Sequence, residues 1–191
     1  MKQAQVLTKE EIRKVIKVCE LTRHEDRNKL IVHLSFLSGM RAVEIANLRV
    51  KNVLNANNEV LDVIALDKSQ TKGNKGQSIY VGKVLKKELT KYFAKFPKLA
   101  DRKEGYLLRT QKGHFTSLTI QHLFKHLYTL ANIPNATSHS GRRSFITELS
   151  EKGVSVRVIQ ELARHSSLQT TQRYIDVSVP KLKGAVDLIG V

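Results

Sequence analysis

One stretch near the middle of the chain departs from the helical spacing of apolar residues that runs through most of the rest. The segments "EVLDVIAL" (59–66) and "QSIYV" (77–81) have the composition of β-strands, and the polar segment between them contains two glycines and three lysines. This pattern predicts one β-hairpin or small antiparallel sheet. Because helices are expected on both sides of it, the predicted fold class is α+β and mostly helical.

Amphipathic helices are predicted before and after the hairpin. A capping box from Thr8 to Glu11 opens the first helix, whose apolar residues recur at helical spacing. A second helix stops at Gly39, and a short third helix follows from Arg41. Ser167 is expected to cap a last helix that carries Tyr174. The second helix covers about residues 25–38, and the other predicted helices cover about residues 83–96, 118–130, 140–151 and 155–163.

The charge balance predicts a polyanion as the partner. The chain has 33 lysines and arginines against 17 aspartates and glutamates, which gives a formal net charge of +16. Nucleic acid is the first expectation for a chain this basic. A membrane surface is the second, although no segment is apolar over a stretch long enough to span a bilayer.

Other features of the sequence exclude several classes of protein. Cys19 is the only cysteine, so a disulfide framework and a cysteine-based metal cluster are excluded. The start "MKQAQVLTKEE" lacks the apolar core of a signal peptide, so a cytoplasmic location is expected. His122 and His126 are spaced like a metal pair, but no glutamate lies between them and no third ligand is evident. No phosphate-binding loop indicates ATP, and no cofactor or metal is predicted.

The chain has no internal repeat and no linker, and its 191 residues suit a single domain over residues 1–191. Residues 177–191 form a tail that Pro180 separates from the segment before it. Apolar residues fall at helical spacing in this tail and form a stripe that needs a partner: Leu182, Ala185, Val186 and Ile189. The stripe packs either on its own domain or on another protein surface.

Five polar residues are candidates for phosphate chemistry. His139 and Arg142 are three apart, so a helix would place them on one face, where the guanidinium could bind a phosphate and the imidazole could move a proton. The alternative is a solvated basic face. Arg41 and Glu44 are either a surface ion pair or an arginine that a carboxylate directs into a site. Lys72 lies at the hairpin tip and is either a solubilising lysine or a mobile cation that reaches a substrate.

Tyr174 is the candidate nucleophile. It lies in a polar stretch rich in hydroxyl groups, and it follows His165 by nine residues. The other tyrosines are expected to have structural roles. Tyr92 and Tyr128 read as core residues, Tyr80 lies in a predicted strand, and Tyr106 precedes two leucines and is expected to be buried. The alternative for Tyr174 is a packed core aromatic.

Taken in the order of the chain, Arg41, Lys72, His139, Arg142, His165 and Tyr174 make the sequence resemble the catalytic domain of the tyrosine recombinase (phage integrase) family. The resemblance covers nearly the whole chain. "SGMRAVEIANLRVKNV" (38–53) is similar to the first arginine box of the family, "TKGNKGQSIYVG" (71–82) to its lysine hairpin, and residues 139–178 to its second box. The resemblance implies the fold of that catalytic domain, which is mostly helical with a small antiparallel sheet.

The resemblance also implies an activity: site-specific cutting and rejoining of double-stranded DNA through a 3′-phosphotyrosyl intermediate, without metal or ATP. Glu44 would orient the first arginine. Tyr174 would be the nucleophile, and Arg41 and Arg142 would bind the phosphate oxygens. Lys72 would be the acid for the leaving 5′ oxygen. His139 would act as an acid/base group, and His165 would donate a hydrogen bond to the phosphate.

The family further implies partners and a setting. The DNA sites would be held by a tetramer in which each tail, residues 177–191, docks on a neighbouring protomer, together with accessory DNA-bending proteins. The cell would be prokaryotic or the gene phage-borne. The chain resembles short members such as the fimbrial switch recombinases, so no separate N-terminal DNA-clamping domain is expected. The alternative is an excised catalytic fragment of a longer protein.

Four positions depart from the family pattern. In the second box Gly141 stands where a packing leucine is usual and Arg143 where a histidine is usual, and the family's Leu-Gly-His becomes Ala163-Arg164-His165. Rival interpretations are a non-enzymatic DNA-binding protein, which explains the charge but not the ordered residues, and a type IB topoisomerase, which resembles the same active site. A metal-dependent nuclease is the weakest interpretation because no carboxylate cluster is present.

Overall fold

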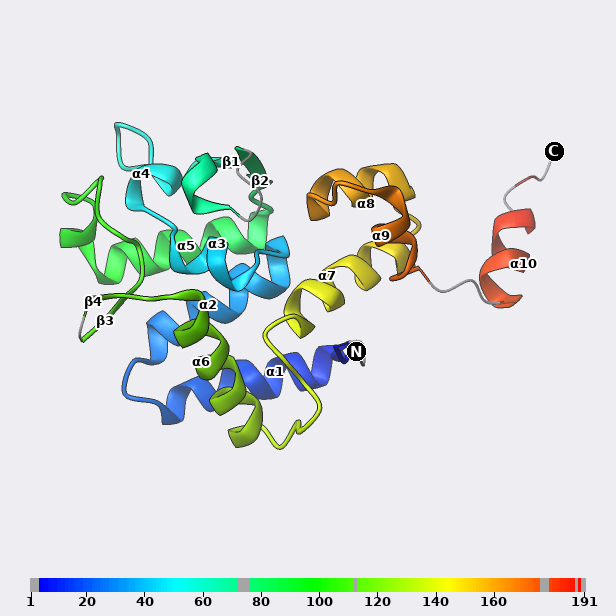
Figure 1. Ribbon diagram of the computed structural model, residues 1–191, viewed down its shortest axis with the longest axis horizontal. Helices are drawn as coiled ribbons and strands as arrows, with labels where there is room; N and C mark the ends of the chain where they lie inside the picture. The colour runs from blue at the N-terminus through cyan, green and yellow to red at the C-terminus, as the bar shows by residue number, and fades with distance from the viewer. Residues whose placement is uncertain (1–3, 72–75, 112, 176–178, 188, 190–191) are drawn as a thin grey trace. The chain divides into compact units, whose positions relative to one another are not determined.

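The computed structural model describes residues 4–71, 76–111, 113–175, 179–187 and 189 (Figure 1). The chain divides into two compact units, Met1–Phe145 and Ile146–Val191. The first turn of helix α7 (Ser140–Glu151) belongs to the first unit, and the rest of α7 belongs to the second.

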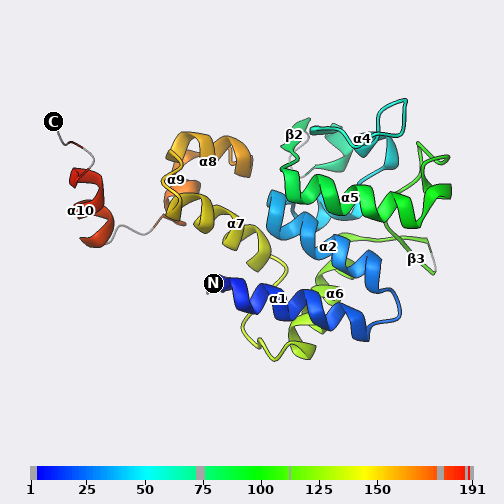
Figure 2. The same cartoon turned by 180° about the vertical axis from the view of Figure 1, so that it is seen from behind.

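The first unit is built around α2 (Glu25–Ser38), a helix that is buried along most of its length. Leu30, Ile31 and Leu34 of this helix are at most 2% exposed. Figures 1 and 2 show α2 between α1 (Lys9–Val18) and α5 (Lys83–Lys95), so apolar side chains on several sides of α2 find partners. The other helices of this unit are α3 (Ala42–Ala46), α4 (Val50–Val53), α6 (Ser117–Leu130) and the short 3-10 helices η1 (Cys19–Leu21), η2 (Lys68–Gln70) and η3 (Pro97–Leu99).

The ends of the helices follow the local signals in the sequence. Glu11 accepts a hydrogen bond from the Thr8 backbone N–H at 2.8 Å, and the Thr8 hydroxyl accepts one from the Glu11 N–H at 3.2 Å, so the predicted capping box is confirmed. Helix α2 ends at Gly39, which has a φ of +62°, a conformation that glycine adopts without steric cost. Helix α7 likewise ends before Gly153, with a φ of +75°.

The predicted hairpin is present but shorter than expected. Strand β1 (Val63–Leu66) pairs antiparallel with β2 (Gln77–Tyr80), and Ile64 opposite Ile79 gives the pair its buried face. The expectation that the first strand begins at residue 59 was wrong, because Val60 makes only an isolated bridge to Leu54. A second pair, β3 (Arg109–Thr110) with β4 (Gly113–His114), was not anticipated, since two residues are too few for a periodic pattern.

The second unit contains the rest of α7 and three further helices, α8 (Val156–Ala163), α9 (Leu168–Gln172) and α10 (Val179–Asp187). Ile159 and Ala163 of α8 are fully buried. The prediction that Tyr174 lies on the last capped helix was wrong: α9 ends at Gln172, and Tyr174 lies in the turn that follows. Ser167 is the N-cap of α9, but its side chain makes no capping hydrogen bond.

The other aromatic and apolar predictions had mixed outcomes. Tyr128 is buried as expected, whereas Tyr106 is only half-buried and stacks on His114 at 4.5 Å between ring centroids. Leu182 and Val186 of the tail stripe are exposed, by 56% and 68%. Among the helices that the structure describes, none combines the length and the apolar character needed to cross a bilayer.

Candidate active site

The predicted site residues fall into two groups, one in each unit. Arg41, Glu44, His139 and Arg142 belong to the first unit, whereas His165 and Tyr174 belong to the second. The predicted acid, Lys72, lies outside the described residues.

Arg41 is fixed by a carboxylate from the helix that it precedes. It is the N-cap of α3, and its backbone N–H donates to Glu44 Oε2 at 2.8 Å. Its guanidinium donates to Glu44 Oε1 at 2.6 Å. The Glu44 side chain is fully buried while that of Arg41 is 21% exposed, so the interpretation as an ordinary surface pair is wrong. A buried carboxylate needs such hydrogen bonds to offset its desolvation. The same hydrogen bonds hold the Arg41 guanidinium in a fixed orientation.

Arg142 is fixed by a backbone carbonyl that lies far away in the sequence. Its guanidinium donates to the carbonyl oxygen of Gly39 at 2.7 Å, and the residue is only 5% exposed. The interpretation as a solvated basic face is therefore wrong for Arg142. His139, which lies one residue before α7, is exposed, and its backbone N–H donates to the Thr137 hydroxyl at 3.2 Å.

The turn after α2 brings the two arginines into one local framework. Gly39 accepts the hydrogen bond from Arg142, and Arg41 follows it by two residues. A Cβ atom at Gly39 would lie 2.7 Å from Cδ1 of Phe145, so both the backbone conformation and the space require glycine here. The left-handed turn at Gly39 therefore positions a carbonyl for one arginine and starts the segment that carries the other.

Gly141 allows α7 to approach α2 closely. A Cβ atom at this position would lie 2.9 Å from Cβ of Ser35 and 3.2 Å from Cδ2 of Phe36. Gly141, one of the residues that depart from the family pattern, thus lets the first turn of α7 reach Gly39 with Arg142.

The two arginines that depart from the family pattern have structural partners. Arg143 donates to the carbonyl of Ala4 at 2.8 Å and so holds the segment before α1. Arg164 has a φ of +56°, a left-handed conformation that glycine adopts more easily, and its guanidinium donates to the carbonyl of Leu162 at 3.0 Å.

The base of the lysine hairpin is tied to the segment after Arg41. The buried side-chain amide of Gln70 donates to the carbonyl of Asn47 at 2.6 Å and to Oδ1 of Asn52 at 2.8 Å. The amide of Asn52 in turn donates to the carbonyl of Ala65 in β1 at 2.8 Å. These hydrogen bonds fix the 3-10 helix η2 and the strand β1 to the segment that follows Arg41.

In the second unit, the rings of His165 and Tyr174 stack. Their centroids are 5.7 Å apart and their planes make an angle of 22°. Both residues are half-buried, so the alternative of a packed core aromatic for Tyr174 is wrong. The Tyr174 backbone N–H donates to the carbonyl of Thr171 at 2.9 Å, which sets the turn after α9.

Two residues that the sequence analysis did not single out support this pair. Thr171 is fully buried, and its hydroxyl lies 2.9 Å from Nδ1 of His165. Gln160 binds the His165 backbone twice, because its carbonyl accepts the His165 N–H at 3.1 Å and its side chain donates to the His165 carbonyl at 3.2 Å. In the sequence, the one indication of a role for Thr171 was its position, six residues after His165 and three before Tyr174.

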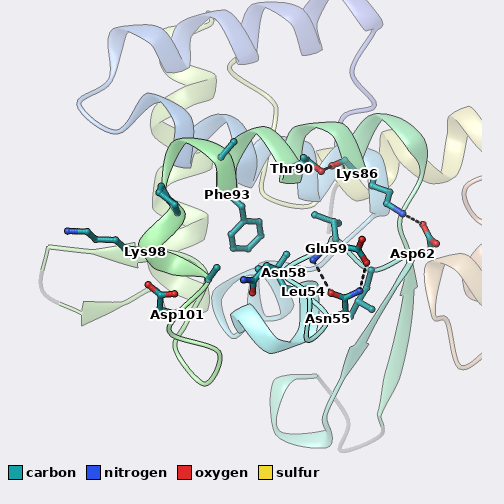
Figure 3. Close-up of a pocket in the computed structure, with 15 residues that line it drawn as sticks. Leu54, Asn55, Asn58, Glu59, Asp62, Lys86, Thr90, Phe93, Lys98 and Asp101 are labelled. Carbon is teal, nitrogen blue, oxygen red and sulfur yellow. Dashed lines mark hydrogen bonds and ion pairs between the residues drawn. The ribbon is translucent and has the colours of Figure 1, made fainter.

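A large hollow in the first unit lies elsewhere and contains none of the predicted site residues. It has a volume of about 950 Å³ and is lined by one face of α5, by η3 and the residues after it, and by the loop after α4 (Figure 3). Phe93 points into it, and Lys86 pairs with Asp62 at its rim at 2.6 Å. Within the described ranges, no group of three or more histidine, cysteine or carboxylate side chains is placed to hold a metal ion.

The sequence as a whole matches a family profile and several curated relatives. Residues 5–180 match the sequence profile of the phage integrase family. Tyrosine recombinase XerA of Pyrococcus horikoshii is 33% identical over 187 residues, which are 95% of this chain and 60% of the relative. Tyrosine recombinase XerC of Leptospira interrogans is 32% identical over 163 residues, 83% of this chain and 49% of the relative. The chain therefore spans about three fifths of the length of the XerA relative.

Solved structures share the fold. A crystal structure of XerA recombinase superposes with a TM-score of 0.74 at 22% identity, covering 97% of this chain and 66% of that one. XerH site-specific recombinase bound to its difH substrate gives a TM-score of 0.73 at 21% identity, covering 97% of this chain and 54% of that one. The predicted fold class is confirmed by these likenesses.

Proposed function

The chain belongs to the phage integrase family, and on this premise we propose that it is the catalytic part of a site-specific recombinase that cuts and rejoins double-stranded DNA. The observation that carries the proposal is the stacked pair of His165 and Tyr174 in the turn after α9. A half-buried tyrosine in a turn, beside an imidazole, has the access that a nucleophile needs and that a fully buried core aromatic lacks. The net charge of +16 supports a polyanionic substrate.

The proposed reaction is phosphoryl transfer from DNA to the protein and back. The Tyr174 hydroxyl oxygen attacks the phosphorus and forms a 3′-phosphotyrosyl bond, while the bond to the 5′ oxygen breaks. Lys72 supplies the proton that the leaving 5′ oxygen takes up, and His139 acts as acid and base near the nucleophile. Because the tyrosyl ester retains the energy of the phosphodiester, the 5′ hydroxyl of a second DNA strand can attack it, and the step needs no ATP.

Charge stabilisation in this scheme comes from the arginines. As the phosphorus becomes five-coordinate, negative charge grows on the two non-bridging oxygens, which Arg41 and Arg142 are proposed to bind. Glu44 and the Gly39 carbonyl hold these guanidinium groups in place before the substrate arrives. A pre-positioned donor loses no free energy to reorganisation during the reaction. His165 would add a hydrogen bond to the same phosphate.

The proposed partners are recombination sites in double-stranded DNA and further protomers of the same protein. Exchange between two duplexes needs four strand cleavages, which four copies of one nucleophile can supply in a tetramer. The exposed Leu182 and Val186 of α10 are proposed to dock on a neighbouring protomer. Accessory DNA-bending proteins and a cytoplasmic location complete the proposal. Removal of residues 181–191 should leave DNA binding intact and reduce the assembly of paired sites in sedimentation experiments.

Trapping of the covalent intermediate tests the function directly. A duplex that carries the recombination site and a nick beside the scissile phosphate loses its short 5′-hydroxyl fragment after cleavage, so the protein–DNA adduct accumulates. The native chain should form this adduct, and the Tyr174→Phe variant should bind the duplex without forming it. Tyr80→Phe is the matched control, because Tyr80 is 59% exposed and lies in β2, outside the proposed site.

The outcomes separate the rival functions. An adduct from Tyr174→Phe would contradict the assignment of the nucleophile. Binding of DNA without an adduct from the native chain would indicate a non-enzymatic DNA-binding protein. Relaxation of supercoiled DNA without exchange of strands between sites would indicate a topoisomerase.

The acid is tested by a substrate that needs no proton. A 5′-thio leaving group departs as a thiolate, so this substrate should be cleaved by Lys72→Ala at nearly the native rate, whereas cleavage of ordinary DNA should fall sharply. Lys75→Ala is the control, and rescue of that variant instead would transfer the role of acid to Lys75.

A further inference from the structure

We infer that Thr171 is a positioning residue that fixes both the tautomer and the orientation of His165, so that the imidazole donates to the substrate phosphate from Nε2. The local geometry stands on its own, whereas the consequence for catalysis rests on the proposed function. Thr171 is fully buried, and its Oγ1 lies 2.9 Å from Nδ1 of His165.

The direction of this hydrogen bond follows from the needs of the hydroxyl group. A threonine hydroxyl has one proton to donate and two lone pairs to accept with. Within the part of the chain that the structure describes, Oγ1 of Thr171 makes this single hydrogen bond. If Nδ1 were the donor, the buried hydroxyl proton would lose its acceptor, which disfavours that arrangement by about tenfold or more. The hydroxyl therefore donates, Nδ1 accepts, and the ring proton lies on Nε2.

The backbone of His165 is fixed separately from its ring. Gln160, which is 7% exposed, accepts the His165 N–H with its carbonyl and donates its side-chain amide to the His165 carbonyl. The amide is itself oriented, since its Oε1 accepts a hydrogen bond from Arg157 at 3.1 Å. Gln160 holds the backbone of His165 on both sides, and the hydrogen bond with Thr171 restricts rotation of the imidazole ring.

Thr171 also connects the two residues proposed to act on the phosphate. Its hydroxyl binds the ring of His165, and its carbonyl accepts the backbone N–H of Tyr174. A single buried residue thus sets the orientation of the imidazole and the turn that carries the tyrosine. The two rings that it connects lie 5.7 Å apart between centroids.

The consequence for the reaction is a donor that does not need to be charged. A neutral imidazole whose proton lies on Nε2 can donate to a phosphate oxygen, so this hydrogen bond does not require the imidazolium form. DNA cleavage should therefore persist at pH 8, and its dependence on Thr171 should be visible there.

NMR of the full chain, labelled with ¹⁵N, tests the inference without reference to DNA. At pH 8, long-range ¹⁵N–¹H correlations should show His165 as a single tautomer with the proton on Nε2, and NOEs should connect its ring to that of Tyr174. In Thr171→Val, which keeps the shape but lacks the hydroxyl, these NOEs should weaken as the ring reorients. Thr171→Ser, which keeps the hydroxyl, should match the native spectrum.

The cleavage assay then measures the effect on catalysis. Thr171→Val should reduce the rate of adduct formation on the nicked duplex by about tenfold to a hundredfold, because small misplacements of a catalytic group have effects of this size, while Thr171→Ser stays near the native rate. A proton on Nδ1 in the native chain, or unchanged NOEs in Thr171→Val, would overturn the inference whatever the activity. If the NMR results are as expected but the native chain forms no adduct, the recombinase function fails and the positioning by Thr171 stands.

Discussion

Substitution of Gly141 by alanine should force apart the two helices that position Arg142. The added Cβ would lie 2.9 Å from Cβ of Ser35 and 3.2 Å from Cδ2 of Phe36, whereas carbon atoms in contact prefer about 3.5–4.0 Å. Ser35 Oγ lies closer still and can rotate away, but Ser35 Cβ is attached to the α2 backbone, so the contact is relieved only if the first turn of α7 moves by about 0.6–1 Å.

The size of the effect follows from this displacement. A shift of about 0.6–1 Å is enough to carry the hydrogen bond between Arg142 and the Gly39 carbonyl from 2.7 Å past the usual limit of about 3.2 Å. Overpacking of a dense core generally destabilises by about 1–3 kcal/mol. The better helix propensity of alanine offsets about 0.5–1 kcal/mol of this. The expected net loss in the free energy of unfolding is therefore about 1 kcal/mol, and at most about 2.5 kcal/mol.

Thermal unfolding followed by circular dichroism measures this loss, at about 2–4 °C per kcal/mol for a chain of this length. Gly184→Ala is the matched control, because Gly184 is also a helical glycine but has no atom within 4 Å of the added Cβ. The control should melt at the native temperature or slightly above it. Adduct formation should fall in Gly141→Ala alone, because Arg142 is the phosphate clamp that moves.

A compensating substitution provides the refutation. Ser35→Gly removes the Cβ that the new methyl group meets, so the double variant should recover part of the stability that Gly141→Ala loses, with a coupling of about 0.5–3 kcal/mol. Equal melting temperatures for Gly141→Ala and the native chain would refute the reasoning, as would strictly additive effects of the two substitutions.

Four further predictions concern other buried or strained groups. Glu44→Ala should destabilise by an amount at or below the low end of the roughly 3–5 kcal/mol for breaking a buried pair, because Arg41 keeps a fifth of its side chain in water, and urea unfolding measures this. Arg164→Gly should stabilise the chain by about 1 kcal/mol in the same assay, because glycine adopts the φ of +56° without the steric cost. Burial lowers the pKa of His33 below its usual 6.5, so the unfolded chain binds a proton at this residue more readily than the folded chain does. The folded state therefore loses stability as the pH falls below 6.5. His33→Leu should flatten that part of the plot of stability against pH. Burial raises the pKa of Cys19 to about 12, so the folded thiol keeps its proton while the unfolded thiol ionises near 9; stability should decline as pH rises from 9 towards 12, and at pH 8 a thiol reagent should label the protein only in urea.

Local structure was largely determined by the sequence alone. The capping box of Thr8 and Glu11 and the left-handed turn at Gly39 depend on groups at most four residues apart, so the residue types are sufficient to predict them. The hairpin follows from a change of period that needs no knowledge of the surrounding fold. The order of the candidate residues also identified the family, because six spaced positions in local context rarely recur by chance.

The local signals were less reliable where a short element ends. Tyr174 follows Ser167 at a spacing that a helix could include, yet α9 ends at Gln172. The turn that carries Tyr174 forms because its N–H binds the carbonyl of Thr171, which is fully buried against α8 and the His165 loop. Packing, which the helix propensity of five residues cannot predict, decided where this helix stops.

The chemistry of the site depended on contacts that no local pattern reveals. Arg142 and Gly39 are 103 residues apart, and their hydrogen bond exists because a glycine at position 141 lets α7 lie against α2. In the sequence, Gly141 was only a departure from the family pattern. A glycine in a helix can let a neighbouring helix approach, or it can leave a gap where a side chain would have packed. Which of these occurs depends on the atoms that face the glycine, and only the packed tertiary structure determines those atoms.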